Sequence, residues 1–576
     1  MKQNLLAIIA LIFIHSAFAS TSDSLYIDSV SRKLPSNYFF DKMPNGLEIL
    51  VIQDASMPIV TSSLVVRNGS MNETADINGV ANLYRSMFFK SNREYQTPEM
   101  LAKRVAEIGL VYSGAVRAEL VTYNVTTASN EIYNGLDFLN NCLRYPNLLK
   151  QDFNLVHNEM ANEYASSQSD PILVLRDDLY RKLWKNNYCR KNPLGNYNVV
   201  MNGGPKEINE VRQKYYYPEN SLLIVNGDVK PESVIEKAGA FFGDWERAHF
   251  SIPDQYPVPE FDTLMYSTSS ISINDIANNP YYMVGFHGPD TRKGLKEILA
   301  TLILSRVCQL PQSKFQSDLV QSGLSSSASL NYDWCKYVGP IELLVVPNAG
   351  KLEPTLNELL KVMNNLNKTD YFTSEQIETA KKMLKAEWAY QTENFEGYSY
   401  LLGRLWASGS PFYWSEFISN LDSISASDIS SVVNTYITNK PYVVGALASL
   451  ALKSELEAVF VETKPIDKYI NFFNTNTTTI TDSANLRVMY EVEYLMKLNP
   501  KYKLSVHGYA DWTGPEDKNL IISQKRADFV KTYLVSRGVI DASRITAIGH
   551  GELPQPENPT EDDKRKQRMV KFSLEQ

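Results

Sequence analysis

Histidine and cysteine, two side chains that often bind transition metals or take part in catalysis, are scarce in this sequence. The six histidines are scattered over 576 residues: His15, His157, His249, His287, His507 and His550. His157 lies on a predicted helix, but the residue one turn later is Ala161, which is no ligand. A lone histidine, such as His249 or His287, is far more often an ordinary surface or core residue. The histidines therefore offer a poor basis for a metal site.

The cysteines and the short motifs restrict the chemistry further. The four cysteines are Cys142, Cys189, Cys308 and Cys335. None forms a C-x-x-C pair, which argues against a zinc ribbon. One or two disulfides could form in an oxidising compartment, but spacing alone does not assign them. The chain also has neither a G-x-S-x-G nucleophile elbow nor a Walker loop.

Charge and the N-terminal segment indicate where the protein acts. The formal net charge is -8, which argues against nucleic acid as the main partner because phosphate binding needs a basic face. Lys2 precedes an apolar run over 5–14, and Ala17-Phe18-Ala19 precedes Ser20. This pattern predicts a signal peptide over 1–19, cleaved near Ala19/Ser20. The apolar run is too short to span a bilayer, so we expect export without an anchor.

Hydrophobic periodicity divides the remaining chain into three units. Residues 36–248 begin with strand patterns at 47–52 and 59–66 and then alternate helical and strand patterns. Residues 263–450 repeat this order, which suggests an internal duplication, and a proline-containing linker over 249–262 joins the two units. A smaller unit over 466–576 has strand, helix, strand and helix patterns. The expected fold class is α+β.

The duplicated region resembles the pitrilysin/insulinase-type zinc peptidases, and also the mitochondrial processing peptidase and cytochrome bc1 core subunits. The resemblance rests on the order of several short motifs, each of low specificity: Asn45-Gly46-Leu47, Asn68-Gly69-Ser70 with Glu73, Gly79-Val80-Ala81, Pro193-Leu194-Gly195, Tyr217-Pro218-Glu219-Asn220 and Gly227-Asp228-Val229. It implies two tandem pitrilysin-like α/β-sandwich repeats.

The resemblance also shows where the chain departs from the family's chemistry. The family binds zinc through an H-x-x-E-H helix and a downstream glutamate, and the helix glutamate acts as general base. Here Asn82 and Ser86 replace the two histidines, and Arg85 replaces the base. Glu163 matches the third ligand, with which Arg85 could pair. One carboxylate cannot hold zinc, so we expect no catalytic residue, no metal and no cofactor.

The second repeat also departs from the family pattern. Members of the family carry an arginine and a tyrosine there that help to hold the substrate peptide. Their positions correspond to Val320 and to a site near Ser326 in this sequence. The resemblance therefore implies that this chain has lost the substrate grip as well as the zinc ligands.

The C-terminal unit resembles the OmpA-like peptidoglycan-binding domain. The matching stretches are Val506–Gly514, Asn519–Ala527, Gly538–Ile540, Arg544-Ile545, Gly549–Glu552, Pro554 and Gln567–Val570. The family's ligand is the free end of meso-diaminopimelate, which carries an ammonium and a carboxylate. Asp511 could accept from the ammonium, and Arg526 could clamp the carboxylate. Asn519 completes the predicted peptidoglycan-binding residues. A plain surface salt bridge between Asp511 and Arg526 is the alternative.

Together these features predict a non-catalytic scaffold that is tethered to peptidoglycan in the periplasm and belongs to an outer-membrane-associated complex. Two-repeat members of the peptidase family usually pair, so we expect a homodimer or heterodimer. Two alternatives remain open. The chain could be the non-catalytic partner of an active zinc peptidase, or it could be a chaperone that binds peptides in the old cavity.

Overall fold

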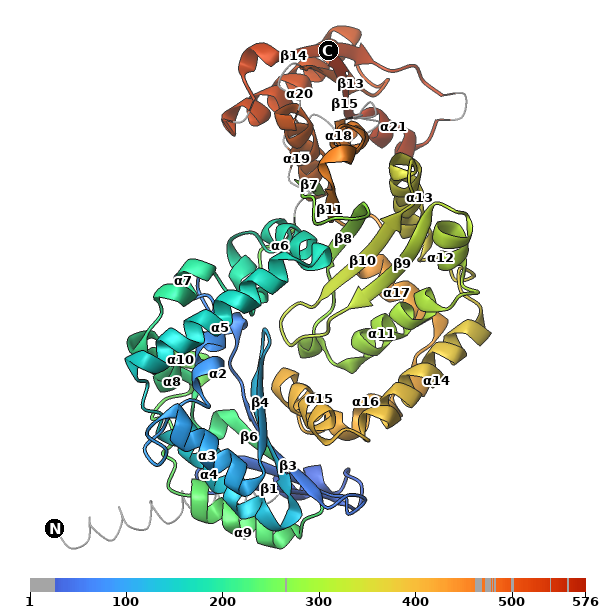
Figure 1. Cartoon of the computed structure of the whole chain (residues 1–576). Coiled ribbons are helices and arrows are strands. Elements are labelled where there is room, and N and C mark those ends of the chain that lie inside the picture. The colour runs from blue at the N-terminus through green and yellow to red at the C-terminus, as the bar shows by residue number, and fades with distance from the viewer. Residues whose placement is uncertain are drawn as a thin grey trace, which may run out of the picture.

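A computed structural model describes most of the chain. The described residues are 26–264, 267–461, 469–471, 478, 480, 483–498, 502–538, 540–556 and 559–575. The predicted signal peptide over 1–19, its cleavage site and His15 lie outside these residues. Within the described residues, no helix has both the length and the apolar character needed to cross a membrane. The chain forms three units, which Figure 1 colours from blue to red.

The first unit is built on a six-stranded sheet of order β1-β2-β6-β3-β5-β4, in which only β2 and β6 pair in parallel. Its strands are β1 Tyr38–Lys42, β2 Glu48–Gln53, β3 Ile59–Val66, β4 Val111–Val116, β5 Val121–Ala128 and β6 Ser221–Gly227. Its helices are α2 Val80–Met87, α3 Pro98–Ile108, α4 Ile132–Arg144, α5 Lys150–Gln168, α6 Pro171–Leu183, α7 Tyr197–Asn202, α8 Pro205–Tyr215 and α9 Pro231–Phe242.

The second unit repeats this topology in a five-stranded sheet of order β7-β11-β8-β10-β9, with β11 parallel to β7. The strands are β7 Thr268–Ile273, β8 Tyr281–His287, β9 Ser325–Tyr332, β10 Pro340–Pro347 and β11 Val443–Ala448. The helices are α10 Ile252–Gln255 in the linker, then α11 Leu295–Gln309, α12 Lys314–Gln316, α13 Leu352–Asn365, α14 Ser374–Gln391, α15 Phe395–Ser408, α16 Tyr413–Ser419, α17 Ala426–Tyr436 and α18 Lys453–Val461. The strand order confirms the predicted pair of repeats.

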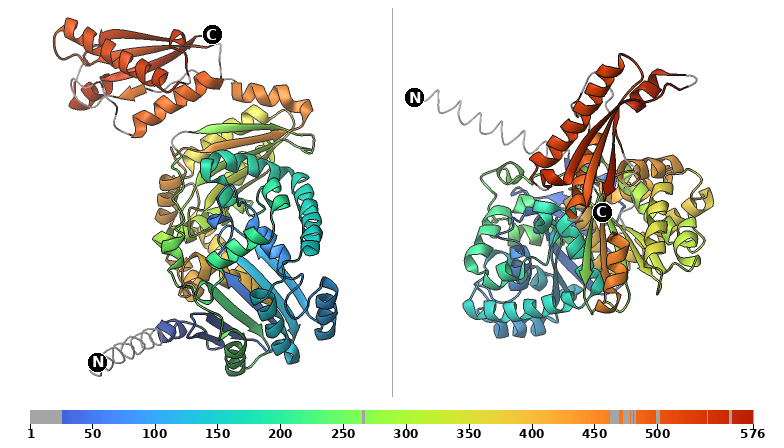
Figure 2. Two further views of the ribbon diagram at one scale, coloured as in Figure 1. Left: turned by 90° about the vertical axis from the view of Figure 1, so that its left-hand side faces the viewer. Right: turned by 90° about the horizontal axis from the view of Figure 1, so that it is seen from above.

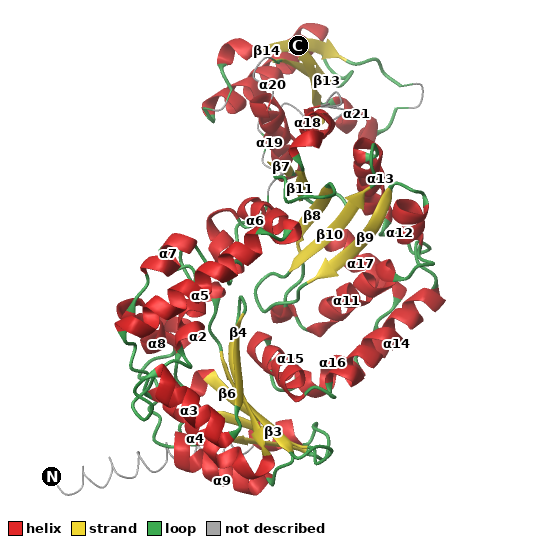
Figure 3. Cartoon of the chain, viewed as in Figure 1, coloured by secondary structure: helices red, strands yellow, loops and turns green. Residues whose placement is uncertain are grey.

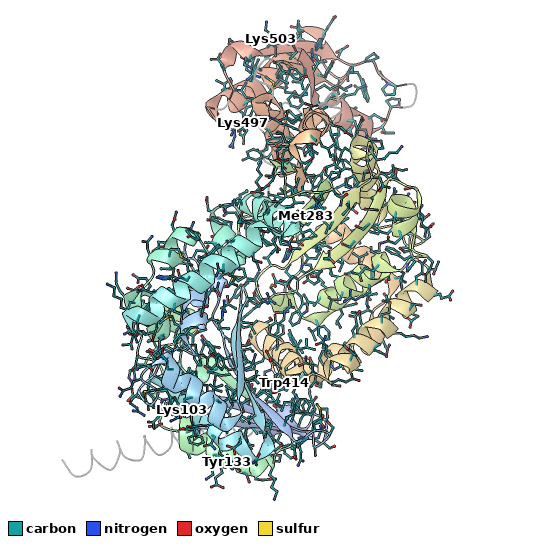
Figure 4. The ribbon with its side chains drawn as sticks, in the orientation of Figure 1. Lys103, Tyr133, Met283, Trp414, Lys497 and Lys503 are labelled. Carbon is teal, nitrogen blue, oxygen red and sulfur yellow. The ribbon has the colours of Figure 1, made fainter. Side chains whose placement is uncertain are left out.

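The two repeats exchange helices across their interface. Helix α6 of the first repeat packs on β8 and β11 of the second, where Gly285 and Gly445 leave room for its leucines. A Cβ atom at Gly285 would lie 2.7 Å from Leu179. In the other direction, α15 of the second repeat packs on β3 of the first through Gly403 and Val65. Figure 4 labels Met283 on β8, beside α6, and Met283 belongs to the same hydrophobic cluster as Leu179. Each repeat therefore completes the hydrophobic core of the other.

The third unit is a four-stranded sheet of order β12-β15-β13-β14, with helices packed on one face. The strands are β12 Tyr469–Asn471, β13 Lys503–Ala510, β14 Ile545–Glu552 and β15 Met569–Glu575, and the helices are α19 Ser483–Leu498, α20 Glu516–Ser536 and α21 Glu561–Gln567. Strand β15, the last strand in the chain, lies inside the sheet between β12 and β13. This unit sits at one end of the molecule (Figure 2), where the Tyr494 hydroxyl accepts from the backbone N–H of Ser269 at 3.1 Å.

Candidate functional sites

The four positions of the altered zinc motif come together between α2 and α5 of the first repeat, which lie side by side (Figure 3). The Arg85 guanidinium donates to Asn82 Oδ1 from Nε at 3.1 Å and from Nη2 at 2.6 Å. The same Nη2 donates to Glu163 Oε2 at 3.1 Å. Ser86 is half-buried at the next position of α2. The expected contact between Arg85 and Glu163 is therefore present.

Neighbouring residues support this position of Arg85. Its aliphatic stem lies against Gly114 on β4, where a Cβ atom would come within 3.2 Å of Arg85 Cγ. A second cation on the same segment, Lys90, pairs with Glu159 of α5 at 2.9 Å. Glu159 and Glu163 are four residues apart and so face the same neighbour. Two ion pairs thus join α2 and the residues just after it to α5.

A zinc ion does not fit these residues. They offer one carboxylate, one hydroxyl and an amide oxygen that already accepts from Arg85, whereas catalytic zinc needs three good protein ligands. The guanidinium keeps its positive charge and repels a cation. Among the described residues, no three His, Cys, Asp or Glu side chains are placed to hold a metal ion.

Glu73 holds the beginning of α2, a contribution that sequence reasoning missed. Its carboxylate is 3% exposed and accepts from the backbone N–H groups of Gly79 and Ala81, both at 2.8 Å. Asn78 Nδ2 also donates to it at 3.0 Å. Burial raises the pKa of Glu73 from 4.5 to about 7, although these hydrogen bonds act in the opposite direction. Glu73 lies seven residues before the first residue of α2, and a glutamate at that distance gave no local signal of this contact.

The positions that correspond to the family's substrate grip lie in the second repeat. Val320 is a partly buried side chain packed on the core of that repeat. The Ser326 hydroxyl donates to the carbonyl oxygen of Val346 at 3.3 Å. Neither side chain can make the ionic or phenolic contacts of the residues that it replaces.

A cavity of about 890 Å³ lies between the two repeats. Helices α5, α6 and α15 and strands β9 and β10 contribute to its walls. Three of its arginines pair with carboxylates on those walls: Arg176 with Glu342, Arg181 with Asp177, and Arg404 with Asp333. The cavity therefore has charged side chains in its walls, and these three ion pairs balance much of that charge.

The four cysteines and the single histidines do not add a site. Cys142, Cys189, Cys308 and Cys335 are all buried and free. His287 stacks on Trp184, and burial lowers its pKa to about 4. In the third unit, His507 Nδ1 lies 2.8 Å from His550 Nε2 on the sheet face away from α20.

Asp511, predicted to bind peptidoglycan, lies directly after β13 and is buried. Its Oδ2 accepts from Arg568 Nη1 at 2.8 Å, and both side chains are 6% exposed. Its Oδ1 accepts from the backbone N–H of Thr513 at 2.9 Å and from the Thr513 hydroxyl. Burial raises the pKa of Asp511, but the hydrogen bonds from Thr513 and Arg568 outweigh it and leave the pKa below its ordinary value. Asp511 is therefore ionised and already paired.

Arg526 reaches the same place from α20. It is 1% exposed, and its Nη1 donates to the carbonyl oxygen of Tyr509 at 2.8 Å. Burial and the nearby charge of Arg568 lower its pKa to about 10, while Asp511 acts in the opposite direction. The structure thus brings Asp511 and Arg526 together and adds Arg568. Sequence reasoning missed Arg568 as a site residue, although the Gln567–Val570 motif contained it.

Asn519 lies two turns before Arg526 on α20. Its Nδ2 donates to Glu552 Oε2 at 2.6 Å. Helix α20 can lie this close to β13 and β14 because Gly508 and Gly549 face it. A Cβ atom at Gly508 would lie 2.0 Å from the Ser523 carbonyl oxygen. The glycines therefore position both Asn519 and Arg526.

Comparison with known families and proteins agrees with this architecture. Residues 48–196 match the family described as insulinase (peptidase family M16), 205–384 match the peptidase M16 inactive domain, and 472–570 match the OmpA family. Over 360 residues the chain is 21% identical to "Zinc protease PqqE" of Helicobacter pylori, covering 61% of this chain and 79% of that protein.

Two further comparisons concern the fold and the C-terminal unit. The fold is similar to the crystal structure of a protease from Helicobacter pylori, with a TM-score of 0.65 and 19% sequence identity. The match covers 72% of this chain and 100% of the Helicobacter pylori chain. The C-terminal unit is 36% identical over 118 residues to "Probable lipoprotein YiaD" of Escherichia coli, which covers 19% of this chain and 53% of that protein. The chain therefore joins the two domains of the M16 peptidase family to a C-terminal domain of the OmpA family.

Proposed function

We propose that this protein is a non-catalytic scaffold of the cell envelope, in which an M16-type body is tethered to peptidoglycan by its OmpA-family domain. The proposal that the protein is non-catalytic rests on the position of the Arg85 guanidinium. It lies between Asn82 and Glu163, where the family's chemistry requires a zinc-bound water and a general base. A fixed cation can perform neither task.

The tether rests on the buried charges around Asp511. Arg526 is desolvated, and its lowered pKa indicates that its charged form gains from a further anion. A carboxylate of a diaminopimelate stem peptide would supply that anion in bidentate geometry. The predicted signal peptide and this proposed ligand both support a location in the periplasm, beside the wall and the outer membrane. There the body would serve as a docking surface in a dimer or larger complex.

Sedimentation with purified sacculi tests the proposed tether. The full chain should pellet with sacculi, while Asp511→Ala and Arg526→Ala should remain in the supernatant. Lys531→Ala, a substitution at a partly exposed position later on α20, is a matched control that should pellet normally. Equal pelleting of all variants would contradict the proposal.

The cavity supports a second candidate, a chaperone that binds peptides without cutting them. Its volume of about 890 Å³ is within the usual range for ligand sites. In the described part of the chain, β4 pairs only with β5, so its outer edge can accept an extended peptide. Fluorescence anisotropy with unfolded peptides, compared between the full chain and a Gly114→Pro variant, tests this candidate.

A further inference from the structure

A second, smaller pocket lies where the linker meets both repeats. Arg67 follows β3 of the first repeat, Lys336 lies in the connection between β9 and β10 of the second, and Tyr256 belongs to the linker. The pocket that they line has a volume of about 100 Å³. This volume exceeds the roughly 10–15 Å³ that one water molecule requires, and it is below the roughly 300 Å³ of the smallest sites for drug-sized ligands. The pocket therefore suits a small polyatomic ion.

Arg67 brings a partly buried guanidinium to this pocket. Its Cζ atom lies 3.5 Å from the centre of the Trp406 ring, and its Nη2 donates to the carbonyl oxygen of Trp406 at 3.3 Å. Burial lowers the pKa of Arg67, although the charge of Glu48 acts in the opposite direction. Glu48 accepts from Trp406 Nε1 at 2.6 Å, and no acid in the described part of the chain forms an ion pair with Arg67. Because a guanidinium has five N–H donors, Arg67 keeps donors for a ligand.

Lys336 brings a second positive charge to the same pocket. Burial lowers the pKa of Lys336, and the nearby charges of Arg67 and Arg292 lower it further. Glu119 acts in the opposite direction, but its carboxylate accepts from the backbone N–H groups of Lys336 at 2.6 Å and Tyr337 at 2.8 Å. Among the described residues, no carboxylate forms an ion pair with the Lys336 ammonium. Glu119 therefore holds the connection between the strands, and both cations line the pocket without an ion pair.

The geometry of the two cations indicates which anion the pocket fits. Like charges that lie close together destabilise each other, and an anion between them removes that cost. The planar fork of an arginine binds two oxygens of one phosphate, and a lysine ammonium acts on the same group as a point charge. A phosphate group carries about -1.5 to -2 charges at neutral pH, which two cations match better than they match a carboxylate.

We propose that Arg67 and Lys336 form a binding site for a phosphate group. Because the linker and both repeats line the pocket, a bound phosphate fixes their relative positions. This inference depends neither on the proposed tether nor on the altered zinc motif.

Isothermal titration of the full chain with inorganic phosphate, at constant ionic strength, tests the site. Lys336→Met removes one charge, and Arg67→Lys keeps the charge but removes the fork. Each should weaken phosphate binding by about tenfold, the usual effect of losing a hydrogen bond to a charged group. Phosphate should also raise the melting temperature of the wild type more than that of Lys336→Met. Lys336 is partly exposed in a connection, so its substitution leaves the packed core intact.

Arg93→Lys is a matched control. Arg93 also stacks on an aromatic ring, with its Cζ atom 3.6 Å from the centre of the Tyr145 ring, but it is exposed and does not line the pocket. This variant should bind phosphate like the wild type.

Glycerol phosphate and acetate are the second and third probes. Binding of glycerol phosphate with similar affinity identifies a phosphomonoester as the source of the group, and binding of inorganic phosphate alone identifies the free ion; both results support the site. Acetate that binds as tightly as phosphate would show that the pocket recognises carboxylates, and the proposal would be wrong. It would also be wrong if the wild type did not bind phosphate, or if Lys336→Met and Arg67→Lys both bound it like the wild type.

Discussion

At the scale of single residues, two arginines change what the neighbouring acidic side chains can bind. Arg85 places a guanidinium where the peptidase family has a general base, and it pairs with the remaining carboxylate of Glu163. Arg568 forms an ion pair with Asp511. From the sequence alone, Asp511 was expected to be a carboxylate available to a ligand. In both places one charged side chain determines what its neighbours can bind.

The altered zinc motif should be repairable because the third ligand already reaches α2. We predict that Asn82→His, Arg85→Glu and Ser86→His, combined in one variant, will bind zinc at one ion per chain by elemental analysis. Histidines four residues apart share a helix face, and Glu163 supplies the third ligand. At zinc concentrations about 100-fold above Kd, binding should add about 2.7 kcal/mol to stability. Adding Glu163→Gln should abolish this gain, and a folded triple variant without zinc would contradict the prediction.

The pair of Asp511 and Arg568 should be strongly coupled. We predict that Arg568→Met destabilises the C-terminal domain by about 3–5 kcal/mol, because it leaves a buried carboxylate unpaired. Hydrogen exchange of β13 and α20 in the full chain measures this loss. Adding Asp511→Asn should recover part of the protection, since the unpaired charge is then absent. If the two substitutions are simply additive, the residues are not coupled.

At the scale of elements, the N-terminus of α2 depends on a buried carboxylate. Glu73 receives three hydrogen bonds, yet burial raises its pKa from 4.5 to about 7. A carboxyl group with a raised pKa in the folded state favours folding most when it is protonated. Its contribution is complete below pH 4.5 and declines as the pH rises to about 7.

We therefore predict that the wild type loses stability between pH 5 and pH 7.5 relative to Glu73→Gln. The difference corresponds to roughly 3 kcal/mol at most. Glu73→Gln itself lowers stability at pH 5, because an amide cannot accept from both Gly79 and Ala81. Melting temperatures of the two proteins should thus converge as the pH rises. A constant gap between them across this range would show that Glu73 does not titrate there.

At the scale of the whole molecule, the exchanged helices make the two repeats one folding unit. Helix α6 belongs to the first repeat by sequence but packs with its leucines on the sheet of the second. Helix α15 returns the contact through Gly403 and Val65. Neither repeat can bury its own sheet face alone, so the body is expected to unfold as a unit.

We predict that Leu179→Ala, made in the first repeat, reduces hydrogen-exchange protection in β8 and β11 of the second. The loss should be about 2–5 kcal/mol, the usual cost of removing a buried leucine side chain. Leu173→Ala on the exposed side of the same helix should have little effect, since Leu173 is 43% exposed. Loss of protection confined to the first repeat would contradict the exchange of helices.

The sequence alone determined the element order, the duplication and the absence of zinc ligands. Periodicity and local motifs encode these features directly, as at 47–52 and at Asn82 and Ser86. Edge strands such as β4 escaped detection because their half-exposed residues carry a weak pattern. Only the tertiary structure decided that Arg568 pairs with Asp511, 57 residues away, and that α6 serves the other repeat. Such contacts depend on how elements far apart in the sequence approach one another in space. Local sequence patterns carry no information about that approach.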